Sequence, residues 1–346
     1  MRIVIPSVQV PFIRGGAEVM TKGLCEALKD KGHDIEIVTI PYKFFPEKYV
    51  SSLMDFCLGL DFDSFSGYSV DRIIVLQFPA YYVKHEHKSI WLMHQHRAVY
   101  DAYDGESASA DLKGLREKVI HTDTQELSKM RKIYSMSQNI TNRLKRYNHI
   151  DSIPLYHPPF GEERFYCEEP YNYIFYPSRL EAHKRQGLLI QAMQYTKTPV
   201  KAILSGTGGQ LPRLQQLIES LGLNDRVKMI GYITEDEKYA YYARSLAVFF
   251  GPHDEDYGYV TLEAMLSQKP VVTCTDSGGP LEFIADGENG FIVGPEPRGI
   301  AEKIDWFYHY KQKAHQMGKN GLDLYWSKNI RWDYVADRLL SAAVKY

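Results

Sequence analysis

The feature that most constrains the fold of this chain is a repeated alternation of short apolar runs with helix-like patterns. In the first half, apolar runs bounded by turn residues predict β-strands at 2–8, 34–40, 72–78, 89–95 and 132–137. A helix is predicted from about residue 17 to 31, after the first run and a glycine pair. Strands that alternate with helices are typical of a parallel sheet with crossover helices. We therefore expect an α/β fold with a doubly wound sheet.

The alternation stops at 157–172, "HPPFGEERFYCEEPYN", which is rich in proline, acids and aromatic residues and has no apolar period. We interpret this segment as a linker. After it the alternation restarts, with strands predicted at 173–178, 200–206, 227–232, 246–252 and 270–276 and helices at 185–195, 210–221 and 258–268. A chain of 346 residues is long enough for two domains. Ligands of open parallel sheets bind beyond the carboxyl ends of the strands, so we expect sites in a cleft between the two halves.

Composition argues against several classes of protein. The formal net charge of −2 gives no general attraction to nucleic acid. The four cysteines are widely and irregularly spaced, which favours buried thiols over a zinc site or a disulfide framework. No apolar run approaches 18 residues, and the first ten residues are too short and proline-interrupted for a signal peptide. We expect a cytoplasmic protein.

A glycine pair, Gly15 and Gly16, follows the first strand and opens a helix. Glycines let backbone N–H groups approach a ligand, and a helix N-terminus favours anionic groups, but such a pair also serves as plain turn residues. No GxGxxG sequence is present, and "GTGGQL" at 206–211 fails at its last position. A nicotinamide-dependent dehydrogenase is therefore disfavoured.

Two cations, Arg179 and Lys184, lie in "YPSRLEAHKRQG" between a predicted strand and the following helix. An arginine fork and a lysine point charge at the carboxyl edge of a sheet suit a diphosphate. A solvated charged loop is the alternative.

The stretch "EDYGYVTLEAM" places Glu255 in a loop and Glu263 inside a predicted helix that starts near Gly258. A loop carboxylate suits the hydroxyls of a sugar, and a carboxylate in the helix suits a ribose diol. Alternatively, Glu255 is solvated and Glu263 pairs with a nearby cation. A phosphate at the helix start would bind the backbone N–H groups of Tyr259, Val260 and Thr261.

At this point the sequence resembles the family 4 retaining glycosyltransferases of the bacterial cell-surface polysaccharide type. The resemblance rests on the Glu-x7-Glu spacing with the following "LEAM", and on four further segments in the same order. These are "RGGAE", "SRLEAHKRQGLLIQAM", "ILSGTGGQLPRLQQLIESLGLNDRVKMIGYI" with its Gly206 turn, and "KPVVTCTDSGGPLEFIADGENGFIV". The tryptophan-containing C-terminal segment is similar as well.

The resemblance implies the GT-B fold, with two facing Rossmann-like domains and a cleft between them. The first, at 1–160, would bind the acceptor, and the second, at 171–325, the nucleotide-sugar donor. A C-terminal helix at 326–346 is expected to cross back to the first domain. Many relatives have Asn-Gly where this chain has His157-Pro158, so the acceptor side cannot be carried over, and Asp256 replaces a glycine after Glu255.

The resemblance also implies a role for each matching residue. Arg179 and Lys184 would neutralise the departing diphosphate, and Glu255 would hold the transferred sugar. His94 would reach the donor sugar, although His96 competes for this assignment. The implied catalytic set is Glu255, Arg179, Lys184 and His94, and the implied donor-binding set is Gly15, Gly16, Gly206, Tyr257, Gly258, Tyr259, Val260, Thr261 and Glu263.

The implied reaction is the retaining transfer of a hexose from a nucleotide diphosphate sugar, with a UDP- or GDP-sugar as expected donor, to a hydroxyl of a glycan, lipid-linked or small-molecule acceptor. We expect no cofactor and no metal, and interpret the acidic strings at 61–63 and 254–256 as chance occurrences. The alternatives are a GT-B sugar-nucleotide epimerase and a non-catalytic nucleotide-sugar binder.

The segment 129–146 carries six cations and no acid: Lys129, Arg131, Lys132, Arg143, Lys145 and Arg146. It is either a solvated helix face or a patch for peripheral contact with an anionic membrane or a lipid-diphosphate acceptor.

Overall fold

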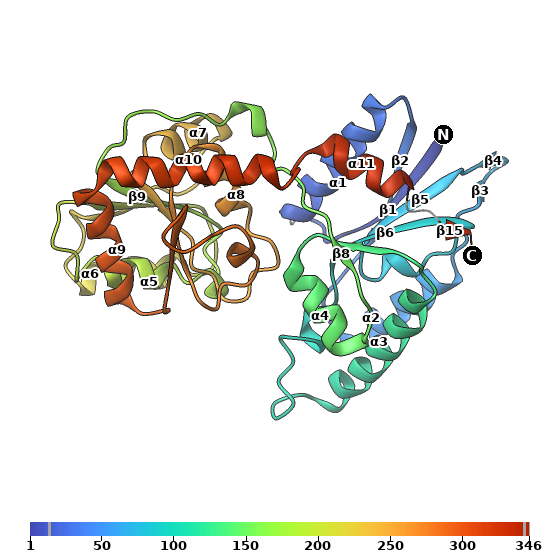
Figure 1. The fold of residues 1–346 in the computed structure, drawn as a ribbon. Helices are drawn as coiled ribbons and strands as arrows, with labels where there is room; N and C mark the ends of the chain where they lie inside the picture. The colour runs from blue at the N-terminus through green and yellow to red at the C-terminus, as the bar shows by residue number, and fades with distance from the viewer. Residues whose placement is uncertain (13–14, 342–343, 346) are drawn as a thin grey trace. The chain divides into compact units, whose positions relative to one another are not determined.

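The computed structural model describes residues 1–12, 15–341 and 344–345, and it divides the chain into two compact units (Figure 1). Unit 1 comprises 1–157 and 330–346, and unit 2 comprises 158–329. Ile13 and Arg14 of the predicted glycine loop lie outside the described residues, as do 342–343 and 346 of the predicted C-terminal helix. No helix in the described part of the chain is both long and apolar enough to span a bilayer.

Unit 1 is a parallel sheet covered by helices. Its strand order is β2-β1-β5-β6-β7-β8, with a short antiparallel β15 beside β6. The strands are β1 (Arg2–Gln9), β2 (Asp34–Pro41), β5 (Arg72–Gln77), β6 (His87–His94), β7 (Ile133–Ser135), β8 (Ile153–Pro154) and β15 (Val344–Lys345), with a separate hairpin of β3 (Ser64–Phe65) and β4 (Tyr68–Ser69). The helices are α1 (Gly16–Asp30), α2 (Glu47–Gly59), α3 (Ala110–Ser128), α4 (Gln138–Asn148) and α11 (Trp332–Ser341). The central residues of β5 and β6, 73–76 and 90–93, are apolar and buried because both faces of the sheet are covered.

Unit 2 repeats this architecture with the strand order β11-β10-β9-β12-β13-β14, all parallel. Its strands are β9 (Tyr173–Pro177), β10 (Lys201–Ser205), β11 (Val227–Met229), β12 (Ala247–Phe249), β13 (Val271–Cys274) and β14 (Gly290–Val293). Its helices are α5 (Gln186–Ala192), α6 (Leu211–Ser220), α7 (Glu235–Arg244), α8 (Tyr259–Leu266), α9 (Pro297–His309) and α10 (Lys311–Ser327). The expected α/β fold with two doubly wound sheets is confirmed.

The sheet of unit 2 reverses its direction of growth between β9 and β12. From β9 the chain adds β10 and β11 on one side, and β12, β13 and β14 follow on the other. Loops that leave two adjacent strands in opposite directions open a crevice at their carboxyl ends, where ligands of such sheets bind. The loops after β9 and β12 contain Arg179, Lys184 and Glu255.

The segment 157–172 is not a free linker, which corrects the prediction. The ring of Phe165 lies 4.7 Å from that of Tyr239 on α7. The backbone N–H groups of Glu168 and Tyr171 donate to the carbonyls of Ala243 and Arg244. Residues 158–172 are therefore packed against unit 2, and the aperiodic sequence gave no sign of it because isolated aromatic anchors have no regular spacing.

The C-terminal segment is also different from the single helix expected over 326–346. Helix α10 ends at Ser327, and Asn329 has a φ of 52°, a left-handed conformation that asparagine tolerates and that ends helices. Helix α11 follows and belongs to unit 1. The Ser89 hydroxyl donates to the Leu339 carbonyl at 2.8 Å, and Trp332 covers Gly23 of α1.

Candidate active site

Two of the predicted residues meet at the crevice of unit 2. Lys184 ends a short 3-10 helix (Ala182–Lys184) between β9 and α5, and Glu255 lies in the loop between β12 and α8. Lys184 Nζ is 2.6 Å from Glu255 Oε2, although the residues are 71 positions apart. Their side chains are 11% and 19% exposed, so the ion pair is largely shielded from water. Glu255 is therefore not a merely solvated carboxylate.

Arg179 lies in the same loop as Lys184 but in a different environment. Its side chain is exposed, and it forms no ion pair within the described ranges. Its backbone carbonyl accepts a hydrogen bond from Gln186 Nε2 at 2.8 Å, which fixes the loop. One cation of the predicted pair is thus held inside the protein, and the other is available to an anion arriving from solvent.

Arg185, which sequence reasoning missed, joins three loops of the site. Its Nε donates to the Gly251 carbonyl at 2.9 Å, and its Nη2 donates to the Pro252 carbonyl at 2.6 Å. Its two terminal nitrogens also hold both carboxylate oxygens of Asp276, and these hydrogen bonds lower the pKa of the Asp276 carboxyl. The sequence does not single out Arg185 next to Lys184, because the partners of Arg185 are far away along the chain.

Gly258 precedes α8 as predicted and has a φ of 89°. A Cβ at this position would lie 3.0 Å from both Phe250 and Pro280, so the turn requires glycine. One prediction here is wrong: the Thr261 N–H is not available to a phosphate, because it donates to the Gly258 carbonyl at 3.0 Å. The N–H groups of Tyr259 and Val260 stay candidates.

Glu263 lies on α8 and is 8% exposed. Its Oε1 accepts a hydrogen bond from Lys238 Nζ at 3.0 Å, and its Oε2 accepts one from the Tyr242 hydroxyl at 2.7 Å. Burial alone would lower the pKa of Lys238, but the charges of Glu263 and Glu235 outweigh burial and raise it. Glu263 therefore pairs with a cation, Lys238, as the alternative interpretation expected. The two hydrogen bonds also fix the orientation of its carboxylate.

Two other predicted donor-binding residues have clear structural roles. Gly206 follows β10 with a φ of 131°, and a Cβ there would lie 2.0 Å from the Ser178 carbonyl oxygen. This glycine lets the loops after β9 and β10 touch. Tyr257 is 2% exposed, and its ring packs 5.7 Å from that of Phe283. Its side chain is covered by protein, and its place in the donor-binding set stays a prediction.

His94, Gly15 and Gly16 belong to unit 1, whereas the residues above belong to unit 2. His94 ends β6 and is partly exposed. His96 is 6% exposed, stacks on Phe78 and hydrogen-bonds the Tyr42 hydroxyl at 3.0 Å. His96 is thus a core residue. Of the two candidates, only His94, at the carboxyl end of β6, is partly exposed to solvent.

Gly15 caps α1, and its N–H donates to the Glu18 carboxylate at 2.7 Å. Gly16 is the first residue of that helix. Glu18 was not singled out from the sequence, although a glutamate three residues after a helix cap is a known N-terminal signal.

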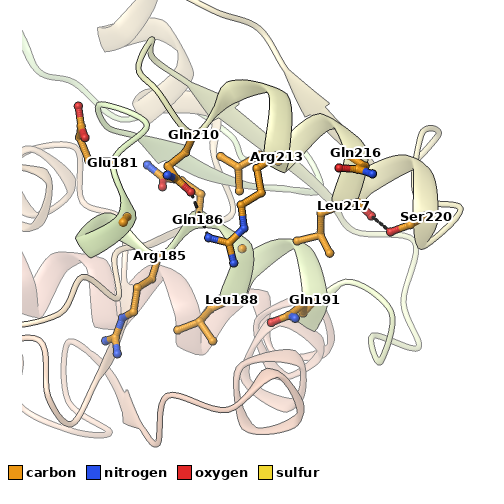
Figure 2. Close-up of a pocket in the computed structure, with 13 residues that line it drawn as sticks. Glu181, Arg185, Gln186, Leu188, Gln191, Gln210, Arg213, Gln216, Leu217 and Ser220 are labelled. Carbon is orange, nitrogen blue, oxygen red and sulfur yellow. Dashed lines mark hydrogen bonds between the residues drawn. The ribbon is translucent and has the colours of Figure 1, made fainter.

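A hollow of about 480 Å³ lies between α5 and α6, and its lining includes Arg185, Gln210 and Arg213 but neither Lys184 nor Glu255. Figure 2 shows Arg213 beside Gln210, with Arg185 extending away from both. The hollow is therefore separate from the carboxylates of the candidate site. Across the described residues, no three acidic, histidine or cysteine side chains are grouped to hold a metal ion.

The basic segment 129–146 does not form one open face. Arg143 is buried, and its Nε lies 3.1 Å from Asp101 Oδ1. Lys129 and Lys145 are paired with Glu126 and Asp151. Arg143 therefore cannot belong to an exposed basic patch for membrane or lipid contact.

The sequence and the structure were compared with known protein families, sequences and solved structures. Residues 163–323 match the family model of glycosyl transferases group 1. These comparisons support a GT-B glycosyltransferase. The group 1 region covers most of unit 2 and includes Arg179, Lys184, Glu255 and Glu263.

Similar proteins that are named glycosyltransferases match this chain over different lengths. A putative glycosyltransferase, EpsD of Bacillus subtilis, is 28% identical over 43% of this chain, and the match spans 39% of its own length. An uncharacterised glycosyltransferase of Methanocaldococcus jannaschii is 22% identical over 96% of this chain and 95% of its own. The solved structure of Anabaena HepE in complex with UDP and glucose covers 98% of both chains with a TM-score of 0.70 and 19% identity, which shows the shared fold.

Proposed function

We propose that this chain is a retaining, metal-independent hexosyltransferase. Its donor is a nucleotide diphosphate sugar, a UDP- or GDP-sugar, and its acceptor is a hydroxyl of a glycan, a lipid-linked or a small molecule. The observation that carries the proposal is the shielded contact of Lys184 with Glu255 at the crevice of unit 2, close in sequence to the start of α8. The group 1 family match and the UDP and glucose bound to HepE support it.

The chemical difficulty of this reaction is charge. As the bond from the anomeric carbon to the phosphate oxygen breaks, the diphosphate gains negative charge and the sugar becomes cationic. Lys184 and the exposed Arg179 supply fixed positive charge for the leaving group, and the positive end of the α8 dipole adds to it. Donors held in place before the reaction avoid the cost of reorganisation and contribute about 3–4 kcal/mol each in known cases.

The carboxylates have separate tasks in this proposal. Glu255, adjacent to the diphosphate lysine, binds hydroxyls of the transferred sugar, because a carboxylate accepts several hydrogen bonds at once. Glu263, oriented by Lys238 and Tyr242, binds the ribose diol. Retention follows from attack on the same face: the acceptor oxygen bonds to the anomeric carbon, and its proton passes to the departing phosphate oxygen.

The proposal is tested first by a panel of UDP-, GDP-, ADP- and TDP-sugars in thermal-shift and turnover assays, with glycan acceptors, with and without EDTA. We expect one donor class to stabilise the protein, turnover to be insensitive to EDTA, and the product to keep the anomeric configuration of the donor by NMR. Isomerisation of the donor without acceptor would establish the epimerase instead. Binding without transfer or hydrolysis would establish the non-catalytic binder.

Lys184→Ala should reduce kcat by about 100-fold or more, because the variant lacks a preorganised cation for the leaving diphosphate. The melting temperature, measured by calorimetry, reports whether the fold is kept. Lys228→Ala is the matched control, since Lys228 is an exposed lysine on β11 of the same unit. Near-normal turnover of a folded Lys184→Ala variant would remove this residue from the mechanism.

A further inference from the structure

Arg185 has a backbone conformation that is unfavourable for its own side chain. It connects the 3-10 helix to α5 with a φ of 53° and a ψ of 39°, which is the left-handed region. That conformation costs an L-residue other than glycine about 1–2 kcal/mol. A long cationic side chain at such a position must make contacts that offset this cost, and these contacts indicate what the residue does.

The guanidinium of Arg185 makes four hydrogen bonds, all to the protein. Two go to the carbonyl oxygens of Gly251 and Pro252, at 2.9 and 2.6 Å. The other two form a bidentate pair with Asp276, at 2.7 and 2.8 Å. An arginine has five N–H donors, so most of its capacity is already used. Figure 2 shows the side chain leading away from Arg213 and Gln210. Arg185 lines part of the neighbouring hollow, but none of these four hydrogen bonds goes to another residue of its lining.

These bonds connect the segments that carry the candidate site. Arg185 directly follows Lys184, and Gly251–Pro252 leads from β12 to Glu255. On the third loop, the carbonyls of Asp276 and Ser277 accept the backbone N–H groups of Asp254 and Glu255, both at 2.9 Å. One side chain thus holds the lysine loop, the glutamate loop and the loop after β13 together.

We propose that Arg185 is a positioning residue that keeps Lys184 and Glu255 in register for catalysis by holding these three loops with its guanidinium fork. The role rests on the function proposed above. Arg185 itself does not bind the donor, because its donors are occupied by Gly251, Pro252 and Asp276, whereas Arg179 is exposed.

Arg185→Gly separates this role from simple stability, because glycine relieves the left-handed backbone while it removes the fork. We expect kcat for sugar transfer to fall at least tenfold, the KM for the donor to change less, and the protein to stay folded at the assay temperature. Arg185→Lys should not restore kcat, because lysine lacks the fork, whereas millimolar guanidinium should partly restore kcat in Arg185→Gly. Arg213→Gly, on the neighbouring helix, is the control.

Asp276→Asn gives a second, independent variant. If both residues act through one clamp, adding Arg185→Gly to Asp276→Asn should cost far less activity than Arg185→Gly alone. A folded Arg185→Gly enzyme with unchanged kcat would overturn the proposal.

Hydrogen exchange tests the clamp without any activity. In Arg185→Gly, but not in Arg213→Gly, exchange should accelerate at the amides of Asp254, Glu255 and Gly279, whose hydrogen bonds join the glutamate loop to the loop after β13. Unchanged exchange at these amides refutes the clamp. Accelerated exchange in a protein that turns over no donor refutes only the glycosyltransferase proposal.

Discussion

Burial separates two histidines that the sequence left as rivals. His94 ends β6 and is partly exposed. His96 is buried in the core, where its ring stacks on Phe78 and hydrogen-bonds the Tyr42 hydroxyl. Burial, with a smaller contribution from His94, lowers the pKa of His96 to about 4 from an ordinary value of 6.5. A residue's type and its place after an apolar run were visible in the sequence, but the direction of its side chain was not.

The shift of His96 predicts acid sensitivity of unit 1. Its pKa is lower in the folded than in the unfolded state, so its contribution is complete above pH 6.5 and is lost as the pH falls toward 4. The loss is on the order of 3 kcal/mol for this shift. Denaturant unfolding followed between pH 7 and 4 measures it. His96→Gln should flatten the pH dependence by about one proton, and an unchanged slope in that variant would contradict the assignment.

The candidate site was predictable where a residue type and its loop position sufficed, as for Lys184, Glu255 and Gly258. It was not predictable where a role depends on partners far along the chain. Arg185 meets Asp276 91 positions away, and Glu263 meets Lys238 from another helix. Such pairs have no fixed spacing, because the sheet order that brings them together is a property of the folded unit.

Among the elements, the buried strands were the most predictable, because a strand covered on both faces must be an apolar run. Strands β9 and β12, which set the position of the crevice, both begin within one residue of their predicted starts. The segment 157–172 was mistaken for a linker because its anchors to unit 2, Phe165 and a few backbone hydrogen bonds, leave no periodic trace.

The close approach of two loops makes Gly206 essential to unit 2. In Gly206→Ala the new Cβ would meet the Ser178 carbonyl oxygen at 2.0 Å while the backbone keeps a φ of 131°. We expect the free energy of unfolding of unit 2 to fall by about 2 kcal/mol or more, measured by calorimetry. Gly209→Ala is the control, because nothing lies within 4 Å of its added Cβ. Equal stability of the two variants would contradict the close packing.

At the scale of the whole molecule, the chain passes twice between the units, at 157–158 and at 329–330. Its last segment completes unit 1 and not unit 2. Helix α11 is held there by Ser89, by an ion pair of Lys31 with Asp337 at 2.7 Å, and by Trp332, whose ring lies against Gly23 and 6.2 Å from that of Trp91.

A chain ending at Asn329 should therefore lose stability in unit 1 alone. We expect calorimetry to show the transition of unit 1 at a lower temperature, or absent, with that of unit 2 little changed. Trp332→Ala should give the same effect in milder form, by about 2 kcal/mol for a partly exposed tryptophan. Trp326→Ala is the control, because Trp326 is 49% exposed and lies in unit 2. A drop in the transition of unit 2 instead would contradict this division.

The return of α11 to unit 1 reverses the usual order in which a growing polypeptide matures. Domains generally fold as they leave the ribosome, with the N-terminal one first. Here the ribosome has finished all of 158–329 before it makes the helix that unit 1 still lacks. Unit 1 is begun first and finished last, so Gly23 on α1 stays without its cover of Trp332 until α11 has been made.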